Sequence, residues 1–226
     1  MKASFNRKPE AVLFDLDGTL LDTAPDFHWV INQLLAEHNL PEQPYAELRK
    51  QVSNGANAML KAAFHFSDEH TNLPALHLQM LDLYAQHVAT DSQLFPGIAN
   101  LLETLEANQI PWGIVTNKPA RFTTPIMAEL QLSQRCASVI CPDHVSQTKP
   151  DPEALLLACH QIKTNPQHCI YIGDHKRDIE AGNRANMFTI GALYGYINKS
   201  DNPSDWHANS YVNHADQILS AIDAHF

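Results

Sequence analysis

The stretch AVLFDLDGTLLDT, residues 11–23, ends an apolar run with two carboxylates one residue apart, Asp15 and Asp17. Like charges this close repel each other, so the pair needs a partner that stabilises it. In an extended segment, residues two apart point to the same side and lie roughly 6 to 7 Å apart, so both carboxylates can flank one small group while Leu16 faces away. Such a pair can serve two roles on one reacting centre, and its hard oxygen atoms suit Mg²⁺ beside a phosphate.

Further polar side chains follow the other apolar runs. Ligands of open α/β sheets bind at the carboxyl ends of the strands, so these side chains are expected to share one rim with Asp15 and Asp17. A single aspartate after a strand is more often a turn former, and the prediction therefore depends on the whole set. Lys149 and Thr116 would hold phosphoryl oxygens by charge and hydrogen bond. The additional members of the set are Thr116, Asn117, Lys149, Asp174 and Asp178.

The apolar runs predict a parallel β-sheet. They are continuous rather than alternating, which is typical of strands covered by helices on both faces. Each run is followed by a polar turn and a helical pattern, so an α/β core is expected. The predicted strands are AVLF at 11, WGIV at 112, SVIC at 138, CIYI at 169 and MFTIGAL at 187, with helices near 97–107, 119–130, 152–162, 177–186 and the C-terminal end.

Residues 24–92 interrupt the alternation of strands and helices. Apolar residues at helical spacing follow Pro25, and the pattern returns between Leu76 and His87 with no strand between them. This segment is therefore expected to be a helical insert. We predict two domains, a core made of residues 1–23 and 93–226 and a helical cap made of residues 24–92.

Composition restricts the possible partners. The 226-residue chain carries 25 acidic and 15 basic residues, and its net charge of −10 would repel a polyanion. We therefore expect a small-molecule substrate and no nucleic-acid partner. No span approaches the roughly 20 apolar residues of a membrane helix and no secretory signal is recognisable, so a cytoplasmic protein without a membrane partner is expected. No strong heptad pattern or exposed apolar run stands out as an interface, and a monomer or a weak homodimer is expected.

Four motifs, DLDGTLLDT from 15, TN at 116, KPDPE at 149 and GDHKRD at 173, resemble in order and spacing those of haloacid dehalogenase (HAD) phosphatases. The resemblance covers essentially the whole chain. VTNKPARF, CPDHV, KPDPE and YGYI are similar to the phosphoglycolate-phosphatase-like branch, most closely its N-acetylmuramic acid 6-phosphate phosphatases, which serve salvage of cell-wall sugars. This implies a Rossmann-like core with an inserted helical cap, and a Mg²⁺-dependent phosphomonoesterase acting on a carboxylated sugar phosphate.

The resemblance also implies roles for individual residues. Asp15 would be the nucleophile that forms an aspartyl-phosphate, and Asp17 would protonate the leaving alkoxide and then accept a proton from water. Thr116 and Lys149 would complete the catalytic set. A carboxylate oxygen of Asp15, the backbone carbonyl of Leu16 and Asp174 would bind Mg²⁺. The implied metal site comprises Asp15, Leu16, Asp17, Asp174 and Asp178.

Substrate contacts are expected from both the core and the cap. Gly18 allows a tight turn that lets neighbouring amides face the phosphate. The SNGANAML stretch offers a corner ahead of a helix start that could face an anion, although an ordinary helix start explains it equally well. Cations near the core loops could meet a substrate carboxylate. The expected contacts are Gly18, Thr19, Asn117, Ser53, Asn54, Gly55, Lys118 and Arg121, with His144, Lys176 and an entrance residue, Trp29, as further candidates.

His175 departs from the pattern, because relatives often carry a small or acidic residue after the first aspartate of this motif. It could alter the outer shell of the metal site or simply point to solvent. Phosphoglycolate phosphatase activity, a phosphosugar mutase and a non-catalytic HAD-fold binding module stay open as alternatives. Dehalogenase activity is disfavoured, because it needs no second acid and Asp17 is present.

Overall fold

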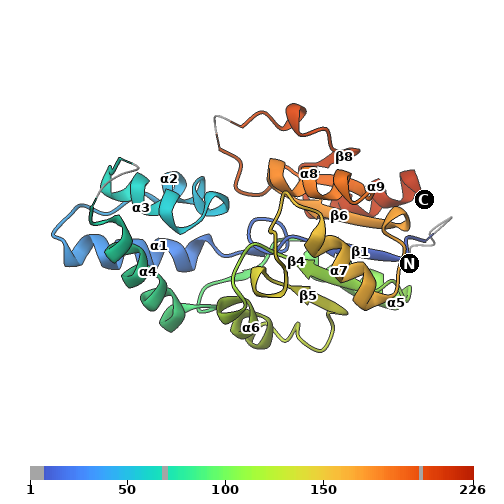
Figure 1. The fold of residues 1–226 in the computed structure, drawn as a ribbon, viewed down its shortest axis with the longest axis horizontal. Coiled ribbons are helices and arrows are strands. Elements are labelled where there is room, and N and C mark those ends of the chain that lie inside the picture. Colours follow the sequence, from blue (N-terminus) through green and yellow to red (C-terminus); the bar gives the residue numbers. More distant parts are fainter. Residues whose placement is uncertain (1–7, 68–70, 199–200) are drawn as a thin grey trace.

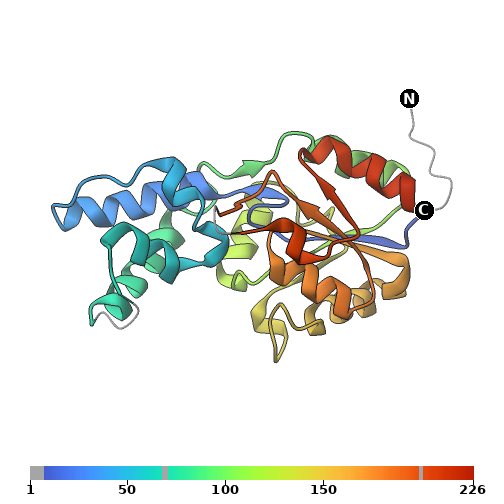
Figure 2. The ribbon, with the colours of Figure 1, turned by 90° about the horizontal axis from the view of Figure 1, so that it is seen from above.

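A six-stranded parallel sheet forms the centre of the larger part of the molecule in this computed structural model, which describes residues 8–67, 71–198 and 201–226 (Figures 1 and 2). β1 lies inside the sheet, where Val12 pairs with Trp112 on one side and Ile170 on the other. In spatial order the strands are β5 (Ser138–Ile140), β4 (Trp112–Val115), β1 (Ala11–Phe14), β6 (Cys169–Gly173), β7 (Phe188–Ala192) and β8 (Ser210–Val212).

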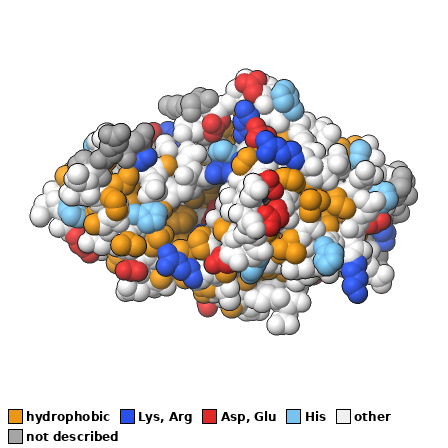
Figure 3. All heavy atoms as spheres, in the orientation of Figure 1, with side chains coloured by type: hydrophobic (Ala, Val, Ile, Leu, Met, Phe, Trp, Pro, Cys, Tyr) orange, Lys and Arg blue, Asp and Glu red, His pale blue; other side chains and the backbone are white. Residues whose placement is uncertain are grey.

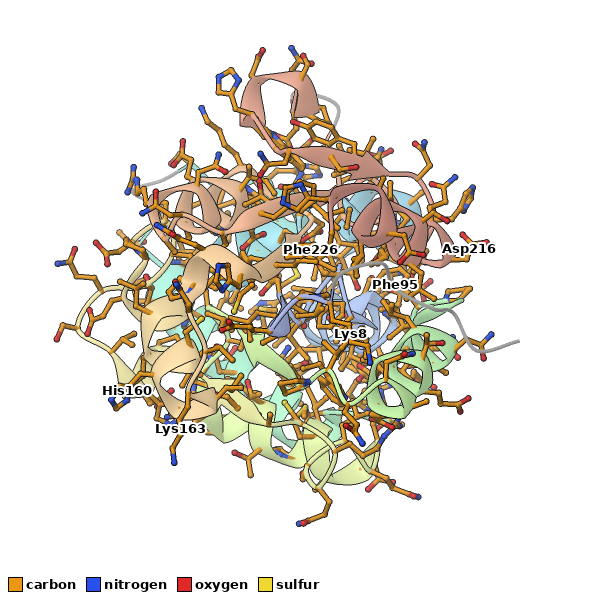
Figure 4. The ribbon with its side chains drawn as sticks, turned by 90° about the vertical axis from the view of Figure 1, so that its right-hand side faces the viewer. Lys8, Phe95, His160, Lys163, Asp216 and Phe226 are labelled. Atoms are coloured by element: carbon orange, nitrogen blue, oxygen red, sulfur yellow. The ribbon has the colours of Figure 1, made fainter. Side chains whose placement is uncertain are left out.

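Helices cover both faces of this sheet, which is why its central strands are continuous apolar runs. Phe14 belongs to one hydrophobic cluster with Leu102, whereas Leu13 belongs to a second cluster with Leu155. Figure 4 shows this two-sided covering from the end opposite the cap, the end at which Lys8 and Lys163 lie. One face carries α5 (Ile98–Ala107), α6 (Ala120–Glu129) and α9 (Ile218–His225), and the other carries α7 (Glu153–Ile162) and α8 (Lys176–Arg184).

Four α-helices lie in the described part of residues 24–92, the segment we call the cap (Figure 1). The first and last pack together, and the rings of Phe27 and Tyr84 stack with centroids 4.2 Å apart. A short antiparallel pair joins the two chain crossings between cap and core, with β2 (Leu21–Asp22) beside β3 (Gln93–Leu94). The cap helices are α1 (Ala24–Glu37), α2 (Tyr45–Arg49), α3 (Ala56–Phe64) and α4 (Leu73–His87).

The predicted fold class, an α/β core with a parallel sheet and an inserted helical cap, is confirmed. The predicted elements differ from the observed ones by a few residues at their ends. The sequence analysis missed β2, β3 and β8, which are short and only partly buried. Among the described residues, no helix combines the length and the apolar character needed to cross a bilayer. Short 3-10 helices lie at η1 (Val52–Asn54), η2 (Pro142–His144), η3 (Pro166–His168), η4 (Pro203–Trp206) and η5 (Ala215–Gln217).

Candidate active site

Three buried carboxylates gather at the carboxyl ends of β1 and β6. Asp15 follows β1, and its backbone N–H donates to the Ile172 carbonyl at 2.8 Å, which fixes the loop against β6. Asp174 directly follows β6, and Asp178 lies in the first turn of α8. One carboxylate oxygen from each of the three aspartates lies within 4.8 Å of the other two. Parallel strands therefore bring together groups that are far apart in the chain.

Lys149 supplies a positive charge to this cluster. Its Nζ lies 2.7 Å from Asp15 Oδ1 and 2.7 Å from Asp178 Oδ1, and it donates to the Tyr171 hydroxyl at 2.8 Å. Burial lowers the pKa of Lys149, but the two carboxylates outweigh burial and raise the pKa above its usual value. The ammonium group therefore stays charged.

Asn117 positions Lys149 through its backbone. The Asn117 amide donates to the Lys149 carbonyl at 3.1 Å and accepts from the Lys149 N–H at 3.2 Å. Thr116 Oγ1 accepts from the backbone N–H of Lys118 at 3.1 Å, which leaves the Thr116 hydroxyl proton available to a ligand. Asn117 thus acts on the lysine loop, and Thr116 is the group that can donate into the cavity.

The carboxylate cluster fits a divalent cation. Three carboxylates face one ammonium group, and burial followed by repulsion from Asp15 and Asp178 raises the pKa of Asp174 to about 8. Burial also raises the pKa of Asp15 to about 6 against the opposing effect of Lys149. Asp174 Oδ1 is buried and has no hydrogen-bond partner among the described residues. Unpaired hard oxygens with excess negative charge are the ligand set that Mg²⁺ or a similar ion binds.

Leu16 is predicted to bind the metal through its backbone carbonyl, and that carbonyl already has hydrogen-bond partners. The backbone carbonyl of Leu16 accepts hydrogen bonds from the N–H groups of Leu20 at 3.1 Å and Leu21 at 2.9 Å. This carbonyl is therefore occupied by the tight turn that leads from β1 to β2. The turn itself depends on backbone hydrogen bonds that no residue type in the motif reveals.

Asp17 lies beside this cluster and has partners of its own. Its Oδ1 accepts from Thr23 Oγ1 at 2.5 Å and from Lys118 Nζ at 2.8 Å. The Lys118 ammonium is buried and lies 4.7 Å from the ring centroids of both Phe27 and Tyr84, so cation–π contacts hold it in place. Lys118 therefore positions Asp17, and its charge is already paired.

The cap is closed over the carboxylates. Ser53 Oγ in η1 donates to Asp174 Oδ2 at 2.9 Å, and the Arg177 guanidinium donates to the Ser53 carbonyl. Arg49 donates to the carbonyls of Gly195 at 2.9 Å and Tyr194 at 3.1 Å, so α2 contacts the loop after β7. These contacts place one cap residue directly against the candidate metal site.

A cavity of about 350 Å³ lies between cap and core. Figure 3 shows hydrophobic side chains gathered in a hollow between these two parts. Asp15 and Lys149 line the core side, so the cavity reaches the candidate nucleophile. Its apolar lining residues, mostly from the cap, are Phe27, Val52, Ala56, Met59, Leu81, Tyr84, Pro119 and Phe122.

Comparison with known proteins agrees with this geometry. Residues 12–192 match the family model described as haloacid dehalogenase-like hydrolase. The chain belongs to the haloacid dehalogenase-like hydrolase family. The family predicted from the four motifs is therefore confirmed.

Two curated relatives of this HAD hydrolase carry different substrate names. A Pseudomonas putida protein named N-acetylmuramic acid 6-phosphate phosphatase is 46% identical over 95% of this chain and 96% of its own length. A Xanthomonas campestris protein named phosphoglycolate phosphatase is 42% identical over 94% and 96%. Among solved structures, a predicted phosphoglycolate phosphatase from Haemophilus somnus has a TM-score of 0.82 at 23% identity, covering 96% of this chain and 99% of that one, which supports the fold alone.

The structure of this HAD hydrolase brings most of the predicted residues to one place. Asp174 and Asp178 lie next to Asp15 but are not among the residues that line the cavity. Gly18 and Thr19 lie in the turn after β1, outside the cavity lining. The predicted residues that line the cavity are Asp15, Asp17, Ser53, Asn54, Gly55, Thr116, Asn117, Lys118 and Lys149.

Several predicted contacts lie outside the cavity of the HAD hydrolase. Arg121 is exposed, and its guanidinium lies over the Phe122 ring, 4.5 Å from the centroid. His144 and Lys176 are also exposed. Trp29 stacks on His87 at 3.9 Å, and neither Trp29 nor these three polar residues lines the cavity. Their predicted contacts with the substrate are therefore not supported by this arrangement.

The sequence analysis missed Arg177, which lines the cavity, and it left two orientations of His175 open. The His175 ring does not point to solvent. It is half-buried, lines the cavity, and accepts from the Arg177 backbone N–H at 3.2 Å to cap α8. Burial lowers the pKa of His175, which favours the neutral ring that this hydrogen bond needs. Arg177 could be recognised only once the first residue of α8 was known. The position at which α8 begins decides whether Lys176 or Arg177 faces the cavity.

Proposed function

We propose that this HAD hydrolase is a Mg²⁺-dependent phosphomonoesterase that acts on a carboxylated sugar phosphate, most specifically N-acetylmuramic acid 6-phosphate. One observation carries the proposal: Asp15 lines the cavity floor, pairs with Lys149 and shares a buried carboxylate cluster with Asp174. Bound at this cluster, Mg²⁺ would supply the positive charge that neutralises a phosphate. A cytoplasmic location and a monomeric or weakly dimeric state belong to the same proposal.

The residues support a two-step reaction. The Asp15 carboxylate attacks phosphorus while the bond from phosphorus to the sugar oxygen breaks, and Asp17 donates a proton to that oxygen. A water molecule then loses a proton to Asp17 and attacks phosphorus, which breaks the aspartyl-phosphate bond, releases phosphate and restores Asp15. The proton donated by Asp17 matters because a sugar alkoxide is a poor leaving group, and general acid catalysis contributes about 10²- to 10⁴-fold in rate.

The size and lining of the cavity favour the sugar phosphate over the smaller acid. A cavity of about 350 Å³ with a mainly apolar wall would leave much of its volume to water if it held phosphoglycolate. An amino sugar with N-acetyl and lactyl substituents would fill that volume and contact the apolar residues. Phosphoglycolate is the second candidate, because other relatives of this chain are named for it.

A substrate panel tests this proposal. The purified protein is assayed with Mg²⁺ on N-acetylmuramic acid 6-phosphate, phosphoglycolate and several neutral sugar phosphates, and kcat/KM is compared. We expect the highest value for N-acetylmuramic acid 6-phosphate and a loss of activity with EDTA that added Mg²⁺ restores. A higher kcat/KM for phosphoglycolate would contradict the proposed substrate, and full activity in EDTA would contradict the proposed metal.

A further inference from the structure

The three cations that line the cavity differ in how their charge is used. Lys149 is paired with Asp15 and Asp178, and Lys118 is paired with Asp17. Arg177 lines the same cavity and forms no ion pair with any acidic residue in the described part of the chain. Its positive charge is therefore the one in the lining that a ligand can neutralise.

Arg177 lies where the core meets the cap. It is the second residue of α8, and its guanidinium donates to the Ser53 carbonyl in η1. Ser53 in turn donates through Oγ to Asp174 at 2.9 Å. Arg177 thus stands beside the candidate phosphate site, with one cap residue between it and the carboxylate cluster.

The chemistry of the guanidinium indicates the ligand. Its planar fork of several N–H donors matches a carboxylate, and the Ser53 carbonyl uses only part of that capacity. A carboxylate that enters a cavity with a mainly apolar wall needs a cationic partner, because an unpaired buried charge is costly. The phosphate has a separate site at Asp15 and Lys149 under the proposed function.

We propose that Arg177 binds the substrate carboxylate and thereby selects phosphorylated sugar acids over neutral sugar phosphates. This inference rests on the proposed function and assigns the specificity of the same cavity to a residue of the GDHKRD motif for which the resemblance implies no role. Ser53 orients the guanidinium through its carbonyl, so the carboxylate site forms only when the cap is closed.

The test compares two substrates that differ at the lactyl group. Wild-type and Arg177→Met proteins are assayed on N-acetylmuramic acid 6-phosphate and on N-acetylglucosamine 6-phosphate, which lacks the carboxylate. We expect kcat/KM of the variant to fall on the order of 100-fold for the first substrate, mainly through KM, and less than about threefold for the second. Lys176→Met is the matched control, because it removes an exposed charge from the adjacent position, and it should keep the wild-type preference.

Each outcome has one meaning. Equal losses on both substrates would overturn the inference, because Arg177 would then serve phosphate binding or cap closure, and unchanged kinetics on both would overturn it as well. A wild-type protein that hydrolyses neither sugar phosphate would overturn the proposed function itself, and this inference with it. Arg177→Lys keeps the charge without the fork and should restore part of the preference, and thermal melting confirms that each variant is folded.

Discussion

Asp174 can approach the loop after β1 because Gly18 has no side chain. Gly18 has a φ of +88°, and a Cβ at this position would lie 2.1 Å from Asp174 Oδ2. Gly195 faces the same aspartate from the loop after β7, where a Cβ would lie 2.3 Å from the Asp174 Cβ. The candidate metal ligand is thus enclosed by two glycines, and the site depends on close backbone approach as much as on carboxylates.

Gly18→Ala should lower the free energy of unfolding by more than backbone strain alone would. Both Gly18 and Gly55 have a positive φ, but a Cβ at Gly55 meets nothing within 4 Å. Gly55→Ala therefore reports the strain, about 1 to 3 kcal/mol, while Gly18→Ala should add about 1 to 3 kcal/mol for the clash with Asp174. Urea denaturation measures both free energies of unfolding, and equal losses for the two variants would contradict the proposed close approach.

The sequence predicted the residue types at the strand ends but not how each group is used. Asp15, Lys149 and Asp174 could be predicted because strand order and motif order determine which loops meet. Lys118 and Leu16 could not, since an ion pair with Asp17 and a backbone turn depend on three-dimensional contacts.

The connection between cap and core is stabilised by a buried carboxylate in α1. Asp26 is fully buried, accepts from the Asp91 backbone N–H at 2.8 Å, and accepts from Ser92 Oγ at 2.5 Å. The chain leaves the core just before Asp26 and returns to it at Ser92. The Asp26 side chain therefore links, by hydrogen bonds, the segment that enters the cap to the segment that leaves it. These hydrogen bonds explain how the two connections between cap and core stay side by side although β2 and β3 pair over only two residues.

Asp26→Ala should lower the free energy of unfolding by about 1.5 to 3 kcal/mol. The substitution removes hydrogen bonds to a charged acceptor and leaves the buried Ser92 hydroxyl without its partner. Thermal and urea unfolding measure the loss. Asp82→Ala, an exposed aspartate in α4, should change stability by less than about 0.5 kcal/mol. If both variants were equally stable, Asp26 would have no role in joining the segments.

Strands were easier to predict than the contacts between elements. β1, β4 and β6 are buried on both faces, so their sequences are continuous apolar runs. β8 has three residues, and two of them are half-buried, so it carries no such signal. Contacts between the cap and the core leave no periodic pattern in the sequence, because they join residues far apart in the chain, such as Ser53 and Asp174.

At the level of the whole molecule, closure of the cap completes the cavity. Arg49 donates to the carbonyls of Tyr194 and Gly195 and lies over the Tyr196 ring, 4.8 Å from its centroid. Tyr196 in turn donates its backbone N–H to Asp174 Oδ2 at 2.8 Å. Closure and the geometry of the carboxylate cluster are therefore linked through one loop. A closed cap also limits access of water to the phosphate.

Arg49→Ala should shift the protein toward a more open form. The variant loses two hydrogen bonds and a cation–π contact between α2 and the core, so we expect a larger radius of gyration in small-angle X-ray scattering and a kcat/KM about tenfold lower. Lys50→Ala serves as the control, because the Lys50 ammonium pairs with Glu47 inside the cap. An unchanged radius and unchanged kinetics in Arg49→Ala would show that this contact does not hold the cap closed.

The central claim is that the Asp15 carboxylate attacks the phosphorus of a substrate held beside the carboxylate cluster. The most direct measurement is the turnover number of Asp15→Asn on N-acetylmuramic acid 6-phosphate, with thermal melting to confirm the fold. The account predicts a loss of at least about a thousandfold, because an amide of nearly the same shape cannot replace the attacking carboxylate. Turnover close to wild type in a folded Asp15→Asn protein would contradict it.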